Sequence, residues 1–327
     1  NLCMRGCPFG AYFSSQAATL PAAARTGNMT LRPHSIVHSL IYDAGTKRDT
    51  GVRVIDEQTG EALEFSAKII FLCASTVPST AILMQTGGMD ESDSLGRYIM
   101  DHHLGVGARG IFEGHLDKTT YGRRPNGFYI PRYRNLHEPG KGYIRGFGYQ
   151  GGAGREGWSR YIEGFGADFK KQFTTWGQWS MGMTGFGECL PYRENRFWLS
   201  TTKKDRWGMP LMEFDASFKE NEEKMRVEMA NDAAEMLEAG GLKDVNIYTS
   251  KASIGLGIHE MGTARMGHSP KVSVLNKWNQ VWAAPNVFCT DGSFMTSAGC
   301  QNPSLTYMAF TARAADYAVS ELKKGNL

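Results

Sequence analysis

The chain has 327 residues, a length that predicts about two domains. It carries 36 Lys and Arg against 33 Asp and Glu, so its formal charge of +3 gives no reason to expect nucleic acid or an anionic membrane as a partner. Hydrophobic residues make up 41%, as in globular proteins, and no apolar run is long enough for a transmembrane helix. The 39 glycines are about 12% of the chain, against a usual ~7%, which predicts many tight turns and close backbone approaches.

The first third of the chain is predicted to be rich in strands and to lead into a helix. Ser35–Tyr42 and Gly51–Asp56 are apolar strand segments, and Ala67–Ala74 is a short apolar run typical of a buried central strand. Pro78–Met84 is typical of the first turns of a helix, because proline is favoured near a helix start.

The region between residues 104 and 215 is predicted to form an antiparallel sheet with one covered face. Short alternating segments, dense in glycine and aromatic residues, are typical of such a sheet. These segments are Gly127–Tyr133, Tyr143–Gln150, Trp176–Gly187 and Arg196–Thr201. Ser217–Ala239 then forms the clearest helix, with capping-box spacing between Ser217 and Glu220 and two glycines after its end.

The pattern G-x-G-x-x-G occurs three times, starting at Gly105, Gly146 and Gly152. In a dinucleotide-binding fold this pattern follows a strand and opens a helix, whose N-terminus binds the pyrophosphate. None of the three matches is followed by a convincing helical pattern or by the expected βαβ frame. We interpret them as turns in the glycine-rich sheet.

Three short motifs near the C-terminus carry the candidate chemistry. They are His259-x-x-Gly262-Thr263, then Asp291-Gly292-Ser293 at the end of an apolar strand, and Asn302-Pro303 before a helix at Ser304–Leu322. Taken separately each is weak, since a lone histidine is usually structural and Asn-Pro is an ordinary helix start. In this order they resemble the C-terminal signature of the glucose–methanol–choline (GMC) oxidoreductases, H-x-x-G-T, D-G-S and N-P.

The resemblance extends upstream to Leu95-Gly96-Arg97 and the following Asp101-His102, which match the family pattern L-G-R-x-x-x-D-H. Neighbouring histidines on a strand point to opposite faces, so His102 and His103 are a poor metal pair. We interpret both as structural loop residues near the flavin-binding domain.

The resemblance implies a fold class and a domain order. The fold would be α/β with antiparallel β: the C-terminal portion of an FAD/NAD(P)-binding Rossmann-like domain, with an inserted, mainly antiparallel-sheet substrate domain. Residues 1–103 and 251–327 would belong to the FAD-binding domain and residues 104–250 to the substrate-binding domain. Family members carry an ADP-binding βαβ unit near the N-terminus, so we expect this chain to be N-terminally incomplete.

The resemblance also implies oxidation of an alcohol by hydride transfer to FAD. His259 would be the base that removes the hydroxyl proton, since an unperturbed imidazole has a pKa of ~6.5, and Asn302 would hydrogen-bond the same oxygen. The residues that match cofactor-binding segments of the family are Val37, Ala74, Ser75, Asp291, Gly292, Asn302 and Pro303.

Within the family, the segment Cys3–Ala11 is similar to the C-x-x-x-C-P-x-G-A stretch of bacterial gluconate, glucose and glucoside dehydrogenases. In some members these two cysteines, with a third one upstream, ligate a [3Fe-4S] cluster, and thiolates suit such clusters. Cys3 and Cys7 are therefore candidate metal ligands. A structural cysteine pair is the alternative interpretation.

The expected substrate is a CH–OH group of a sugar, a sugar acid, a glycoside or another polyol, with electrons passed to a cytochrome or another non-oxygen acceptor. A small partner subunit is also implied. Two alternatives stay open: an oxidase that uses oxygen, and a non-catalytic piece that lacks the ADP-binding half of the flavin site. The resemblance favours a periplasmic location, with the cytoplasm as the alternative.

Overall fold

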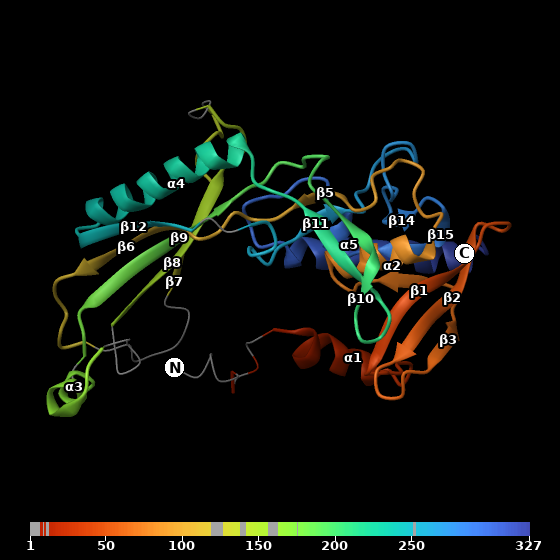
Figure 1. The fold of residues 1–327 in the computed structure, drawn as a ribbon, viewed down its shortest axis with the longest axis horizontal. Coiled ribbons are helices and arrows are strands. Elements are labelled where there is room, and N and C mark those ends of the chain that lie inside the picture. The colour runs from red at the N-terminus through yellow and green to blue at the C-terminus, as the bar shows by residue number, and fades with distance from the viewer. Residues whose placement is uncertain are drawn as a thin grey trace.

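The computed structural model of the chain describes residues 7–8, 10, 13–118, 127–137, 142–155, 163–174, 176–250 and 253–327. Its elements form two lobes (Figure 1). One lobe holds helix α4 (Glu220–Ala239) and a five-stranded sheet, and the other holds α2 (Thr76–Thr86), α5 (Ser304–Lys323) and three smaller sheets. Within the described ranges, no helix combines the length and apolar character needed to cross a membrane.

The five-stranded sheet is antiparallel throughout, and α4 covers one of its faces. In sheet order its strands are β12 (Lys243–Thr249), β6 (Val106–Phe112), β9 (Trp179–Gly187), β8 (Phe147–Arg155) and β7 (Gly127–Ile130). Met225, Met229 and Ala233 on α4 are fully buried in the cluster that joins helix and sheet, as their helical spacing predicts. The predicted sheet with one covered face is confirmed.

Two predicted details of this region are wrong. Helix α4 begins at Glu220 rather than at Ser217, because the Glu222 carboxylate accepts a hydrogen bond from the Lys219 backbone N–H at 3.0 Å and caps the helix there. The segment Arg196–Thr201 is a strand, but it pairs with strands of another sheet and is not part of the five-stranded one.

The glycine motifs lie largely inside strands, so their interpretation as turns is wrong. Gly107 and Gly110 are in β6, and Gly148 and Gly151 are in β8. A Cβ atom at Gly107 would stand 2.0 Å from the carbonyl oxygen of Met183 on β9. The glycines are needed where neighbouring backbones approach too closely for a side chain.

We expect Gly107→Ala to destabilise the protein by about 1–3 kcal/mol, because the new methyl group meets backbone that cannot move aside. Gly154→Ala in β8 is the matched control: a Cβ there meets nothing within 4 Å, so the change should stay within about 0.5 kcal/mol. Urea unfolding of both variants measures the difference. Equal stabilities would contradict the close-approach explanation.

The second lobe is built on a parallel strand pair. β4 (Ile70–Leu72) pairs with β15 (Ala284–Cys289), which is followed on its other side by β14 (Gln280–Val281). Ile82 and Leu83 of α2 share one buried cluster with this pair, and Ala314 and Ala318 of α5 pack against Phe288. The predicted strand within Ala67–Ala74 is buried, yet among the described residues it stands at the edge of its sheet rather than at the centre.

Two further antiparallel sheets complete this lobe. One is the meander β1 (Ser35–Asp43), β2 (Arg48–Asp56) and β3 (Ala62–Ser66). The other has the order β11 (Pro210–Asp215), β10 (Arg196–Lys204), β5 (Arg97–Met100) and β13 (Met261–Thr263).

The remaining short elements of the molecule are a π-helical turn (Ser15–Thr19), α1 (Leu20–Ala24), α3 (Gly166–Gln172) and a 3-10 turn (Gly292–Phe294). The expected class, α/β with antiparallel sheets, is confirmed, and the domain boundaries stay a prediction.

His103 lies where the two lobes meet. Its backbone N–H donates to the carbonyl of Gly187 at 3.3 Å, which bridges the end of β5 to β9. The imidazole is fully buried beside Phe218, and neither ring nitrogen has a hydrogen-bond partner among the described residues. Burial, with lesser contributions from the nearby Arg226 and His102, lowers the pKa of His103 to about 3.

We expect His103 to weaken the fold in acid. The unfolded side chain has a pKa of ~6.5, so between that pH and about 3 the unfolded chain binds one more proton. The free energy of unfolding should then fall as the pH drops through this window, by up to about 1.4 kcal/mol per pH unit. His103→Phe should reduce this slope in urea titrations, whereas His268→Phe, at an exposed site, should leave it unchanged.

Candidate active site

The pairing of β5 with β13 brings two distant histidines together. These strands are antiparallel, with Met100 opposite Met261. His102 follows Met100 by two residues and His259 precedes Met261 by two, so the register places the two histidines side by side. Their rings are 4.9 Å apart between centroids and nearly perpendicular.

The carboxylate of Asp101 holds the backbone that carries both histidines. Oδ1 accepts hydrogen bonds from the N–H groups of His102 at 2.7 Å and His259 at 3.1 Å. Oδ2 accepts from those of Gly255 at 2.8 Å and Gly257 at 2.7 Å. Asp101 is fully buried, so four backbone donors compensate its loss of water. The loop before β13 is thereby fixed to the end of β5.

A direct hydrogen bond joins the two imidazoles. Nδ1 of His102 lies 2.9 Å from Nδ1 of His259, and Nε2 of His102 lies 2.5 Å from the carbonyl oxygen of Gly299. The ring of Phe186 on β9 packs against both histidines. Burial lowers the pKa of His102 and of His259, while the nearby Asp101 opposes the shift. Both rings are therefore neutral near pH 7.

His259 lines a cavity of about 270 Å³ between the loop and the start of α5. Its walls come from the chain after β4, the loop before β13, the turn after β15 and the first residues of α5: Cys73, Ser75, Thr76, Ile258, His259, Glu260, Asp291, Gly292, Pro303, Ser304 and Tyr307. Of the residues singled out in the sequence, Ser75, His259, Asp291, Gly292 and Pro303 meet here. The volume is below that of a typical cofactor pocket, so these residues would enclose only part of a ligand as large as FAD.

Hydrogen bonds between α2, β15 and β13 fix one wall of this cavity. Asp291 accepts from the Ser79 hydroxyl at 2.5 Å and from the Ser293 N–H at 2.9 Å. The Thr76 hydroxyl donates to the carbonyl of Glu260 at 2.6 Å. A Cβ atom at Gly292 would lie 2.3 Å from the Thr76 hydroxyl oxygen, so glycine is required at this crossing.

Two features of the cavity fit a bound flavin. The hydroxyl of Tyr307 is buried without a hydrogen-bond partner in the described part of the chain, so a polar ligand group in the cavity would satisfy it. Ser75 has a φ of +79°, which turns the chain sharply away from β4 at the cavity wall and leaves Ser75 exposed.

Asn302 lies beside the cavity and contacts the other lobe. It is exposed, it precedes the lining residue Pro303, and its side-chain oxygen accepts a hydrogen bond from the side-chain amide of Gln150 on β8. Because that bond occupies the oxygen, the Asn302 amide N–H groups are the part left to donate to a ligand.

The other predicted site residues lie apart from the cavity or outside the described residues. Val37 is in β1 and packs against the core of the second lobe, and Ala74 is exposed beside Ser75; neither lines the cavity. Cys3 lies outside the described residues, and Cys7 has a free thiol. No group of three or more His, Cys, Asp or Glu residues in the described ranges could hold a metal ion.

Sequence reasoning missed three residues of this site. His102 was interpreted as structural, yet it contacts His259 directly. Asp101 clamps the loop, and Gln150 positions Asn302. An Asp-His pair at the end of a strand was visible in the sequence, but its partner became evident only through the β5–β13 register.

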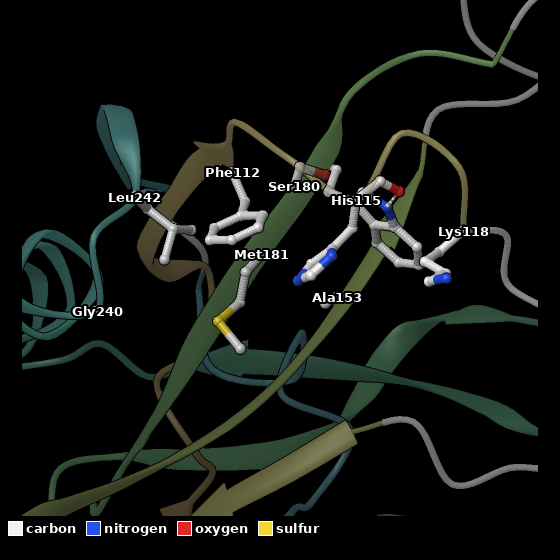
Figure 2. Close-up of a pocket in the computed structure, with 9 residues that line it drawn as sticks. Phe112, His115, Lys118, Ala153, Ser180, Met181, Gly240 and Leu242 are labelled. Atoms are coloured by element: carbon white, nitrogen blue, oxygen red, sulfur yellow. Dashed lines mark hydrogen bonds between the residues drawn. The ribbon is translucent and has the colours of Figure 1, made fainter.

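A larger cavity of about 470 Å³ lies at the far end of the five-stranded sheet (Figure 2). Apolar side chains, among them Phe112, Met181 and Leu242, form most of its lining, and His115 stacks on Phe112. None of the residues assigned to chemistry lines it. A further cavity, lined by Met266, His268 and Trp278, is larger still at about 710 Å³, so cavity volume does not single out the candidate site.

Two family models, both described as GMC oxidoreductase, match residues 191–311 and 1–104. The chain belongs to the GMC oxidoreductase family. It is 30% identical over 338 residues to 2-methyl-1,2-propanediol dehydrogenase from Mycolicibacterium austroafricanum, covering 96% of this chain and 58% of that protein. It is 25% identical over 337 residues to the fructose dehydrogenase large subunit from Gluconobacter japonicus, covering 99% and 60%. The chain thus spans well under two thirds of the length of these relatives.

The fold is also similar to solved structures. Formate oxidase from Aspergillus oryzae RIB40, in a study of FAD modification, superposes with a TM-score of 0.64 at 14% identity, covering 91% of this chain and 62% of that one. The expected family is confirmed, and the relatives include bacterial polyol and sugar dehydrogenases. FAD is the cofactor that the comparisons support, and none of them shows a [3Fe-4S] cluster.

We expect Asp101→Asn to destabilise the protein by about 1.5–3 kcal/mol, because an amide replaces a carboxylate that accepts four backbone hydrogen bonds. Hydrogen exchange should also accelerate at the Gly255, Gly257 and His259 amides. Asp90→Asn is the matched control, since Asp90 accepts from the backbone of Ser94 and Leu95 in another loop. Unchanged exchange at Gly257 in Asp101→Asn would contradict the clamp.

Proposed function

We propose that the protein is an FAD-dependent dehydrogenase that oxidises a CH–OH group of a sugar, sugar acid, glycoside or other polyol. One observation carries this proposal: the Asp101 carboxylate holds His259 at the wall of a cavity. The same cavity is lined by Ser75, Asp291, Gly292 and Pro303. The family and the names of the relatives, a diol dehydrogenase and a fructose dehydrogenase subunit, support the substrate class.

The chemistry divides between the cofactor and the chain. Bound FAD supplies a hydride acceptor, and the substrate carbon gives up a hydrogen with its electron pair while its hydroxyl loses a proton. His259 receives that proton, and an N–H of Asn302 donates to the same oxygen as negative charge develops on it. Gln150 holds the Asn302 amide with its nitrogen available for this contact.

The cofactor would be held by the segments that form the cavity. Ser75 after β4, Asp291 and Gly292 after β15, and Pro303 at the start of α5 line the cavity and would contact it. The Tyr307 hydroxyl would find its missing partner there. Val37 and Ala74, which match adenine- and nucleotide-binding segments of the family, are assigned to its more distant parts.

Electrons would leave through a partner rather than to oxygen. The relative named as a large subunit supports a complex with another subunit, which we assign as a cytochrome or a small accessory chain. We also propose a periplasmic location, in keeping with the same resemblance. Cell fractionation followed by immunodetection tests the location, and recovery in the cytoplasm would contradict it.

We expect His259→Ala to slow flavin reduction by about 10²–10⁴-fold, because the reaction loses its base. The measurement is anaerobic stopped-flow bleaching of the flavin-loaded protein by a panel of sugars and polyols. His268→Ala is the control, since His268 is exposed and lines another cavity. A wild-type rate in His259→Ala would contradict the assignment.

The same experiment separates the alternatives. Rapid reoxidation of the reduced protein by air would indicate an oxidase, whereas slow reoxidation by air and fast reoxidation by a quinone or cytochrome supports the dehydrogenase. A protein that shows no flavin absorbance after incubation with FAD would support the non-catalytic alternative.

A further inference from the structure

The hydrogen bonds around His102 determine where its protons lie. A backbone carbonyl can only accept, so the contact of His102 Nε2 with the Gly299 oxygen places a proton on Nε2. A neutral imidazole has one N–H, so Nδ1 of His102 must be the acceptor in its contact with His259. Nδ1 of His259 is then the donor.

We propose that His102 is a positioning residue that sets the tautomer of His259: by accepting the Nδ1 proton of His259, it leaves Nε2 of that ring unprotonated as the base. This inference rests on the proposed function, because it concerns the same proton transfer. In the reaction the substrate O–H bond breaks and its proton goes to Nε2 of His259, while the C–H hydrogen and both electrons go to the flavin.

This arrangement requires a neutral His102. The cationic ring would donate from both nitrogens, Nδ1 of His259 would have to accept, and the remaining His259 proton would occupy Nε2. The groups that face His102 are Asp101 at the end of β5, His259 on the loop before β13, the Gly299 carbonyl and the ring of Phe186 on β9. Its own burial outweighs the attraction of Asp101 and keeps the proton off.

The fold fixes which atom donates and which accepts in each of these hydrogen bonds. Gly299 stands just before Pro303 and α5, and the Asp101 carboxylate holds the backbone N–H groups of both histidines. Turning either ring over would place a carbon at the contact between the two rings and break their hydrogen bond, and the Gly299 carbonyl can only accept, so the donor and acceptor roles are fixed. The two hydrogen bonds thus connect the Gly299 carbonyl, through His102, to the His259 ring at the cavity wall.

The test reads the tautomer itself. In the chain labelled with ¹⁵N-histidine, nitrogen–proton correlation spectra at neutral pH assign each ring nitrogen as protonated or unprotonated, and the His259 signals are those absent in His259→Ala. We expect His259 to carry its proton on Nδ1. His102→Gln keeps one donor and one acceptor at this position and should preserve the Nδ1–H form. His102→Met keeps neither group and should lose it.

In the flavin-loaded protein, His102→Met should lower kcat by about 10²-fold or more with little change in KM, because the base is in the wrong form rather than absent from the substrate site. His102→Gln should restore most of this loss, which a purely structural role would not predict. His115→Met, in the distant cavity, is the control and should change neither parameter.

A wild-type His259 protonated on Nε2, or a tautomer that is unchanged in His102→Met, would overturn the inference. The wild-type spectrum decides even if a variant fails to fold. The outcome is separable from the proposed function. An Nδ1–H form together with wild-type flavin reduction in His259→Ala would retain the tautomer assignment and reject the role of His259 as the base.

Discussion

The site depends on one buried carboxylate. Asp101 has no access to water, so its charge is tolerable only while several donors surround it. The backbone of His102, Gly255, Gly257 and His259 supplies them, and each of these bonds also fixes the position of a loop residue. A loop with two glycines, which would otherwise lose much conformational entropy on ordering, is held in one conformation by the same bonds that stabilise the charge.

The two imidazoles follow from that constraint. With the loop fixed to the end of β5, His102 and His259 lie in hydrogen-bond contact, and Phe186 packs against both rings. Burial makes both rings neutral, and the carbonyl of Gly299 then leaves one consistent arrangement of protons. The protonation of the two rings thus depends on burial and on one backbone carbonyl more than on neighbouring charges.

Local patterns in the sequence were enough to predict the three longest helices, about half of the strands and about half of the cavity lining. Of the motif residues, His259, Asp291, Gly292 and Pro303 line the cavity, from the loop before β13, the turn after β15 and the start of α5. The roles of Asp101 and His102 depend on the β5–β13 register, which no local period encodes. The expectation that neighbouring histidines face opposite ways agrees with the structure: His102 contacts His259, and His103 is buried with no hydrogen-bond partner for its ring among the described residues.

The glycine content links the two lobes to this chemistry. Glycines in β6, β8 and β9 let these strands approach so closely that side chains would collide with neighbouring backbone or with buried rings, as at Gly107 and at Gly187 beside His103. In β8, Gln150 donates a hydrogen bond to Asn302, next to the cavity-lining Pro303. One lobe therefore supplies the histidine pair, and the other orients the Asn302 amide, which we propose donates to the same substrate oxygen. A change in how the two lobes pack would therefore alter the position of Asn302 relative to His259 without a substitution at either residue.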